Sequence, residues 1–226
     1  MNIRPCTRLR SGALVLAGLA VVALVSHRPA AGQALVRQAD APEVMTAERW
    51  ARDIDVLGAE LPKRHKNLFF KVAEADFRKE VGSLRAALPS LDPDETLVRL
   101  LRLVASVGDS HTALGYRPQR GLPLMLYWFK DGIYVLNTTA EHKEVLDGKI
   151  TALGGRPIAE VTAALASVTP HENGSQLKNL VPNFLVDTAV LHGLKLIPKA
   201  DAASLTVVTG AGDTVTAELA PVAFSS

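Results

Sequence analysis

Apolar residues in the first half of the chain recur at intervals of three and four positions, which is the spacing of one face of an α-helix. The three stripes are Trp50, Ile54, Leu57 and Leu61, then Phe77, Val81, Leu84 and Leu88, and finally Leu97, Leu100, Leu101 and Val104. Thr46 is a suitable N-cap for the first helix, Pro62 is expected to end it, and Pro89 is expected to end the second. We therefore expect three amphipathic helices that bury these stripes against one another.

The third helix carries the strongest boundary signals. Asp92 can cap it, Pro93 fits the first helical position, and Glu95 completes a capping-box pattern. Gly108 suits the left-handed residue that often follows the last turn of a helix. This element is therefore expected to run from residue 93 to a few residues before Gly108.

After residue 111 the pattern changes from helical to extended, and Asp131–Gly132 predicts a β-hairpin between two apolar runs. A helix is expected from Pro157, and another over residues 176–192 with an interruption at Pro182. The expected strands are residues 124–130, 133–137, a segment within 145–153 that ends at the Gly154–Gly155 turn, 203–209 and 214–219. The predicted fold is α+β, with a helical subdomain over residues 40–120 and an α/β module over residues 121–222.

The first 34 residues have the order of a secretory signal peptide. Arg4, Arg8 and Arg10 precede an uncharged apolar run from Ala13 to Val25, and small residues end at Ala34. The apolar run is shorter than the roughly 20 residues that a permanent transmembrane helix needs. We expect cleavage near Ala34, a secreted or periplasmic protein, and no stable membrane span afterwards. An uncleaved N-terminal anchor is the alternative.

Removal of this leader would change the charge of the chain. Residues 1–34 carry four arginines and no acidic residue, so the formal net charge would change from +2 to −2. This balance gives no reason to expect nucleic-acid binding. The single cysteine, Cys6, also lies in the leader, so the mature chain would have neither a disulfide nor a thiolate metal site.

The candidate chemistry lies in the segment Gly108–Thr112, where Ser110 and His111 are adjacent at the end of the third helix. A histidine can act as a general base near neutral pH. The alternative is a structural turn, in which Asp109 and Ser110 bond nearby amides and the histidine is half-buried. His65 lies between Arg64 and Lys66, where a solvated loop residue is more common than a site residue.

Four segments in this order resemble the N-terminal half of the tail-specific (C-terminal-processing) serine peptidases, in their tricorn-like branch. They are His65–Phe70, Gly108–Thr112, Leu122–Leu124 with Asp131–Val135, and Ile150–Ile158. The resemblance covers about residues 46–220. It implies that the module over residues 121–222 is PDZ-like, that His111 is the general base, and that Ser110 helps to orient the site.

Members of that family continue into a β/α core that supplies the nucleophilic serine and an acidic partner, whereas this chain ends at Ser226. We therefore expect the non-nucleophile part of a serine-peptidase-like protein that is inactive as an isolated chain, because a base without a nucleophile forms no acyl-enzyme. The alternative is a non-catalytic peptide-binding or adaptor protein of the cell envelope, acting through the PDZ-like surface.

The expected partner is a polypeptide substrate or a peptide C-terminus, bound as an added strand beside a helix. Val161 and Leu165 lie on one face of the helix from Pro157 and are candidates to line that groove; the alternative is that both are core residues. No cofactor is expected. Asp109 and His111 would be only two ligands of a metal, and no third is apparent, so no metal site is expected either.

A different enzyme class must also be considered, because Gly108-Asp109-Ser110 resembles the nucleophile block of the GDSL esterases and lipases. Those enzymes need an aspartate three residues before a histidine near the C-terminus. None of the six histidines of this chain has an aspartate at that position. The esterase interpretation is therefore disfavoured.

Overall fold

The computed structural model describes residues 45–224, which belong to one compact unit. The expected signal peptide, residues 1–34, lies outside the described residues. No helix in the described part of the chain is long and apolar enough to cross a membrane.

The first half folds into the three expected helices, α1 (Ala47–Arg64), α2 (Glu74–Ala87) and α3 (Pro93–Ala105). Thr46 caps α1 as predicted, since its side chain accepts a hydrogen bond from the amide of Arg49 at 3.4 Å. The expectation that Pro62 ends α1 was wrong by two residues. Proline removes only its own amide from the helical bonds, and the amide of His65 still bonds the carbonyl of Leu61 at 2.9 Å.

The start of α3 has the predicted capping box. The amide of Glu95 donates to Asp92 Oδ1 at 2.8 Å, and the amide of Asp92 donates to Glu95 Oε2 at 3.0 Å. At the other end Gly108 has a φ of +70°, which is the left-handed conformation expected there. This glycine turns the chain out of the helix into the candidate segment.

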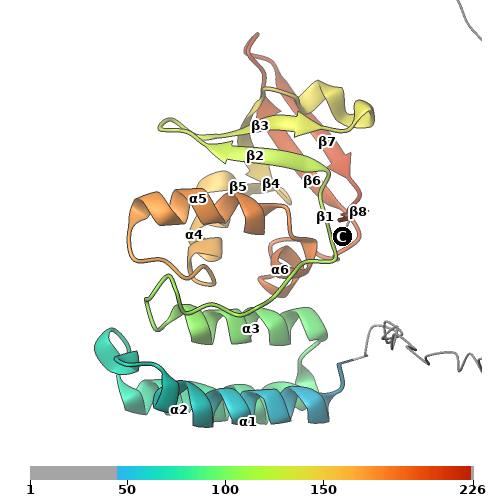
Figure 1. Cartoon of the computed structure of the whole chain (residues 1–226). Coiled ribbons are helices and arrows are strands. Elements are labelled where there is room, and N and C mark those ends of the chain that lie inside the picture. The colour runs from blue at the N-terminus through green and yellow to red at the C-terminus, as the bar shows by residue number, and fades with distance from the viewer. Residues whose placement is uncertain (1–44, 225–226) are drawn as a thin grey trace, which may run out of the picture. The chain divides into compact units, whose positions relative to one another are not determined.

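The second half contains a six-stranded antiparallel sheet, in which five strands follow the order β2-β3-β4-β6-β7 and β5 pairs with β4 (Figure 1). The strands are β2 (Leu124–Trp128), β3 (Ile133–Thr138), β4 (Lys149–Leu153), β5 (Arg156–Pro157), β6 (Ala203–Val208) and β7 (Thr214–Leu219). A separate pair joins β1 (Arg120–Gly121) to β8 (Val222–Ala223). In the described residues β2 pairs only with β3, so it is an edge strand.

Helices α4 (Ile158–Ala166), α5 (Gly174–Leu185) and α6 (Thr188–Gly193) connect the middle strands to the last two. The interruption expected at Pro182 was wrong, because α5 continues through this residue, which is buried in the core with Val181 and Leu185. The helix instead stops before Asp187. The Asp187 carboxylate accepts from the amide of Ala189 at 3.0 Å and starts α6.

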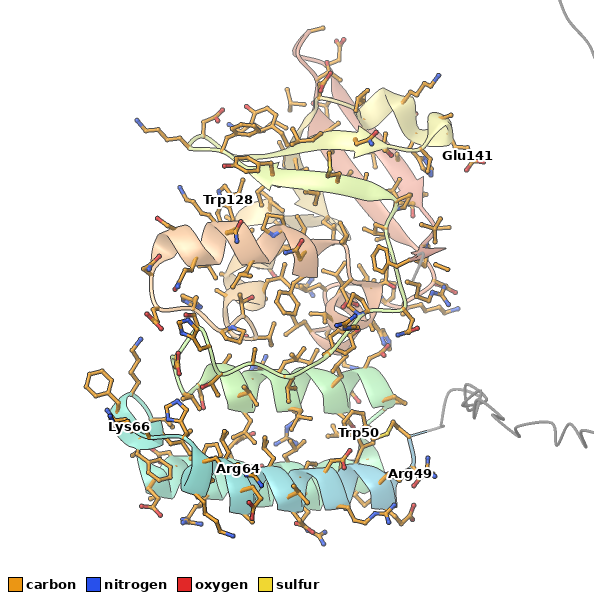
Figure 2. All side chains as sticks on the ribbon, in the orientation of Figure 1. Arg49, Trp50, Arg64, Lys66, Trp128 and Glu141 are labelled. Carbon is orange, nitrogen blue, oxygen red and sulfur yellow. The ribbon has the colours of Figure 1, made fainter. Side chains whose placement is uncertain are left out.

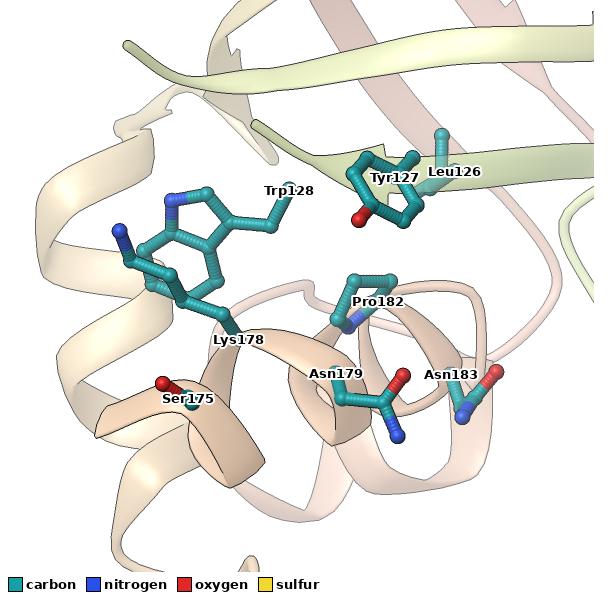
Figure 3. Close-up of a pocket in the computed structure, with 8 residues that line it drawn as sticks. All are labelled: Leu126, Tyr127, Trp128, Ser175, Lys178, Asn179, Pro182 and Asn183. Carbon is teal, nitrogen blue, oxygen red and sulfur yellow. The ribbon is translucent and has the colours of Figure 1, made fainter. Parts of the chain in front are cut away.

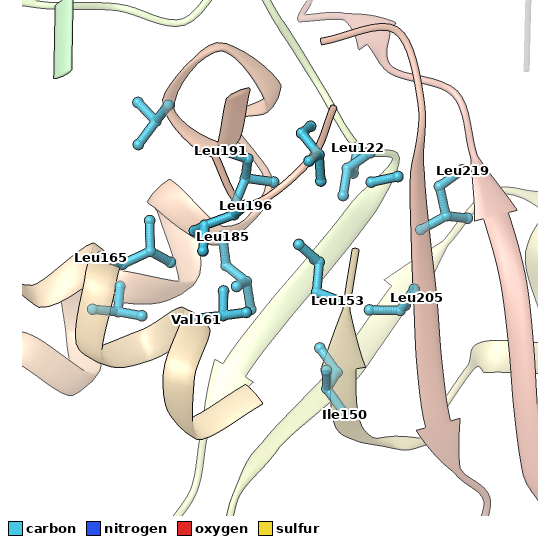
Figure 4. Close-up of a cluster of buried hydrophobic side chains, with 14 of the residues drawn as sticks. Leu122, Ile150, Leu153, Val161, Leu165, Leu185, Leu191, Leu196, Leu205 and Leu219 are labelled. Atoms are coloured by element: carbon cyan, nitrogen blue, oxygen red, sulfur yellow. The ribbon is translucent and has the colours of Figure 1, made fainter. Parts of the chain in front are cut away.

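Two buried clusters hold these elements together. One lies among α1, α2 and α3 and includes Ile54, Phe77 and Leu84. The other lies between the sheet and the helices α4 to α6 (Figure 4). Helix α3 contributes Leu100 to the first cluster and Leu101 to the second, so it separates them and belongs to both. The fold is mixed helix and sheet, in agreement with the α+β prediction.

Candidate functional site

Three segments that are distant in sequence meet around Asp109. His65 follows the last turn of α1, Asp109 follows α3, and Glu172 lies between α4 and α5. They line a pocket of about 300 Å³ together with Asn67, Phe70, Lys71, Val107 and Gly108. The end of α3 thus carries the candidate segment to a position where it meets two loops.

Asp109 is the centre of this site. Its Oδ1 accepts a hydrogen bond from the amide of His111 at 2.9 Å, and its Oδ2 accepts from the Thr112 hydroxyl at 3.0 Å. Nε2 of His65 lies 3.0 Å from Oδ2. The hydrogen bond from the backbone amide of His111 lowers the pKa of Asp109 most, and the hydrogen bond with His65 lowers it next. Together they hold this pKa well below its usual value. Asp109 therefore stays ionised at neutral pH.

His65 is part of the site and not a solvated loop residue, although two cations flank it in the sequence. Its side chain is only 18% exposed. The amide of Asn67 donates to Nδ1 at 3.1 Å, so Nδ1 carries a lone pair and the proton of the neutral ring is on Nε2, which donates to Asp109. The hydrogen bonds thus select the Nε2–H tautomer of His65.

His111 directs its Nδ1 toward the carboxylates of Asp109 and Glu172. Its Nδ1 lies 3.3 Å from Asp109 Oδ1 and 4.0 Å from Glu172 Oε1. A neutral ring can donate to Asp109 Oδ1 only from Nδ1–H, which leaves the lone pair on Nε2. The side chain is 90% exposed, and within the described residues Nε2 has no hydrogen-bond partner. His111 therefore presents a proton acceptor to the surroundings.

Ser110 lies on the carboxylate side of His111 and not beside its Nε2. Its hydroxyl donates to Glu172 Oε1 at 3.1 Å and accepts from Gln176 Nε2 at 3.2 Å. The hydroxyl oxygen is 3.4 Å from His111 Nδ1. Since its proton is directed to Glu172, Ser110 is not arranged as a nucleophile that His111 would activate through Nε2.

Gly108 and Lys71 fix the beginning of the segment. The Lys71 ammonium donates to the carbonyl of Gly108 at 2.7 Å. A Cβ added to Gly108 would meet Lys71 Cδ at 2.3 Å, and the φ of +70° also disfavours other residues. Both the backbone conformation and the close approach of Lys71 therefore favour glycine here.

The structure does not expose Val161 and Leu165, the two residues expected to line a peptide groove. Both side chains are 0% exposed and belong to the cluster between the sheet and its helices (Figure 4). Their helical face is turned to the core because α4 packs against β4 and α5. The alternative given by the sequence, that both are core residues, describes the structure.

A groove of about 390 Å³ lies elsewhere, between the edge strand β2 and helix α5 (Figure 3). Trp128 projects from β2 toward the α5 side of the sheet (Figure 2). The groove is lined by Leu126, Tyr127, Trp128, Ser175, Lys178, Asn179, Pro182 and Asn183. Sequence reasoning missed this groove because it assigned the role to α4 and because the partner helix of β2 lies some 50 residues further along the chain.

Among residues 45–224, two clusters contain enough ligand atoms for a metal ion. They are Asp109, His111 and Glu172, and Asp92, Asp94 and His192. In the first cluster Glu172 supplies the third ligand that the sequence did not reveal. Existing protein contacts account for both. The Asp109 oxygens accept the bonds described above, His192 Nδ1 lies 2.8 Å from Asp94 Oδ2, and the Lys195 ammonium lies 3.7 Å from Asp92.

No protein-family model and no curated protein sequence matches this chain. Solved structures do match its fold. A structure of mature CPAF complexed with lactacystin aligns with a TM-score of 0.58 at 16% identity, over 79% of this chain and 35% of that one. A CPAF mutant aligns with a TM-score of 0.57 at 17% identity. CPAF is a chlamydial serine protease related to tail-specific proteases. This chain thus has the fold of part of CPAF and spans about a third of its length.

Proposed function

We propose that this chain is a peptidase-related protein in which His111 serves as the general base, within the tail-specific serine peptidases and their tricorn-like branch. The observation that carries the proposal is the orientation of His111, with Nδ1 toward two carboxylates and Nε2 open in a 90% exposed side chain. The likeness of the fold to CPAF and the order of the four sequence segments support the same interpretation.

In such a reaction Nε2 of His111 would accept the proton of a nucleophilic hydroxyl as that oxygen attacks a peptide carbonyl. The imidazolium would then give this proton to the leaving amine. Asp109 would stabilise the imidazolium, because its low pKa keeps it ionised. The described residues place no hydroxyl at Nε2, so the nucleophile would come from outside them.

The direct test is hydrolysis of an unstructured polypeptide by the purified chain, with His111→Ala as the control. We expect no turnover from the chain by itself, since loss of the nucleophile in a serine protease lowers the rate on the order of 10⁶-fold. Cleavage that His111→Ala abolishes would mean that a nucleophile within this chain had been missed. Where a longer chain carries the nucleophile, the same substitution should lower its activity by roughly 10²–10⁴-fold.

We also propose that residues 121–222 form a PDZ-like module that binds an extended polypeptide between β2 and α5. An edge strand offers unpaired amides and carbonyls, and the adjacent α5 surface offers side-chain contacts. No charge interrupts β2, and Met125 and Tyr127 are exposed on it. A peptide added there would direct alternate side chains toward α5, whose lining residues are Ser175, Lys178, Asn179, Pro182 and Asn183.

Titration with peptides that have hydrophobic C-termini, free and amidated, tests the groove. Micromolar affinity, about −8 kcal/mol, is expected for the favoured peptides. Asn179→Trp should block the groove and abolish binding, whereas Ala163→Trp, at an exposed position of α4, is the matched control. Equal affinity for amidated peptides would exclude capture of the terminal carboxylate. Equal binding by Asn179→Trp would refute the groove.

A non-catalytic adaptor of the envelope is the second candidate function. The observation that favours it is the combination of a groove with a His111 that has no hydroxyl at Nε2 in the described residues. The reading frame after codon 226 separates the two candidates. A frame that continues into a serine-bearing β/α core supports the peptidase, and a stop codon supports the adaptor.

Export belongs to both candidates, and we propose that the leader is removed after Ala34. The basic, apolar and small-residue order of residues 1–34 supports this. Intact-mass analysis of the secreted protein should give a chain that begins at Leu35. A secreted chain that still begins near Met1 would contradict it.

A further inference from the structure

We propose that Glu172 is a positioning residue for His111 and that Gln176, at the start of α5, holds Glu172 in that role. The proposal rests on the proposed function, since it assigns two residues to the base of that same site. It concerns how the imidazole is kept with Nε2 open. Neither residue belongs to a motif that the sequence revealed.

Glu172 is fixed by three contacts and not left to move freely on the surface. Its Oε1 accepts from the Ser110 amide at 3.3 Å and from the Ser110 hydroxyl at 3.1 Å. Its own amide donates to Gln176 Oε1 at 2.8 Å. These contacts join the loop between α4 and α5 to the candidate segment across 62 residues of sequence.

Gln176 bridges both partners of this arrangement. Its carbonyl oxygen accepts from the Glu172 amide, while its Nε2 donates to the Ser110 hydroxyl at 3.2 Å. The amide of Gln176 in turn donates to Asn173, the N-cap of α5, at 2.9 Å. The first turn of α5 therefore holds both the backbone of Glu172 and the Ser110 hydroxyl that binds the Glu172 carboxylate.

The position of the Glu172 carboxylate matters because the Asp109 oxygens already accept other hydrogen bonds. Asp109 Oδ1 already accepts a hydrogen bond from the backbone amide of His111, and its distance of 3.3 Å to Nδ1 is long for a hydrogen bond to a carboxylate. Oε1 of Glu172 lies on the same side of the ring, 4.0 Å from Nδ1. Two carboxylates together favour a proton on Nδ1, which is the tautomer that leaves Nε2 as the acceptor.

The experiment measures the tautomer of His111 by long-range ¹H–¹⁵N NMR of the full chain, at a pH where the imidazole is neutral. Glu172→Ala removes the carboxylate, while Gln176→Ala leaves in place every side chain that contacts His111. Gln119→Ala is the matched control, because it removes the same amide from a glutamine that bonds only the carbonyl of Arg117 through its side chain. Dispersed amide spectra show that each variant is folded.

We expect both Glu172→Ala and Gln176→Ala to reduce the Nδ1–H form of His111 and increase the Nε2–H form, with no change in Gln119→Ala. Should Glu172→Ala fail to fold, Gln176→Ala and Glu172→Gln carry the test. Unchanged tautomers in folded variants would overturn the proposal and leave the general base of the proposed function standing. Absence of peptide binding or of catalysis in a longer chain would count against the proposed function alone.

Discussion

At the scale of single residues, the sequence revealed His111 but not its surroundings. The motif Gly108–Thr112 places a serine beside a histidine, and local spacing suffices to find it. His65 reaches Asp109 and Glu172 reaches Ser110 only through tertiary packing, across 44 and 62 residues of sequence. No periodicity encodes such contacts, which is why the cationic neighbours of His65 pointed to a solvated loop.

Asp109 should make the stability of the chain depend on pH. Its pKa is lowered in the folded state, so the stability it contributes is present above its unfolded pKa, near 4, and is lost as the pH falls through the lower folded value. Asp109→Asn should therefore unfold at lower urea concentration than the parent near pH 7, and the difference should shrink near pH 2. Asp201→Asn, at an exposed turn, serves as the control. A difference that persists undiminished in acid would exclude an ionic role for Asp109.

Two glycines allow the conformational and steric requirements at Gly108 to be separated. Gly108 and Gly155 have φ values of +70° and +74°, but an added Cβ meets Lys71 only at Gly108. Alanine should cost roughly 1–2 kcal/mol at Gly155 from the left-handed backbone alone, and more at Gly108. Thermal unfolding of both variants measures this. Equal losses would mean that Lys71 moves aside without cost.

At the scale of elements, the helices of the first half were predictable because each carries an apolar stripe and local end signals. Proline was the misleading signal. Pro62 and Pro182 both lie inside helices, since each removes one hydrogen bond while the flanking residues remain packed. The break between α5 and α6 depends instead on Asp187, a buried cap whose role is visible only in the fold.

The capping box of α3 provides a test at this scale. Asp92→Ala removes the acceptor for the amide of Glu95, and the loss should be about 1 kcal/mol of unfolding free energy. Asp92→Asn retains an acceptor oxygen and should lose less. Urea denaturation of the two variants measures the difference. Equal stability of Asp92→Ala and the parent would show that the box contributes nothing.

At the scale of the whole molecule, the α+β class followed from the change of period along the chain, whereas the pairing of β2 with α5 did not. The sequence correctly indicated an apolar face on α4. An apolar stripe has the same sequence pattern whether it is buried in the core or exposed in a groove. Only the packing of α4 onto β4 and α5 assigns Val161 and Leu165 to the core.

This assignment predicts opposite outcomes for core and groove variants. Leu165→Ala should lower the unfolding free energy by about 2–5 kcal/mol, because it leaves a cavity in the cluster of the second half. Asn179→Ala, at the exposed face of α5, should change stability little. Denaturant unfolding compares the two. A small loss of unfolding free energy for Leu165→Ala would contradict the assignment of Leu165 to the core.

The proposed general base depends on the two histidines that flank Asp109. Its most direct test is the long-range ¹H–¹⁵N NMR spectrum of the unmodified chain, in which the ring nitrogens of His65 and His111 are resolved at a pH where both are neutral. The hydrogen bonds predict opposite tautomers, with the proton on Nε2 in His65 and on Nδ1 in His111. A proton on Nε2 of His111 would contradict the account, because that nitrogen could not then accept a proton from a nucleophile.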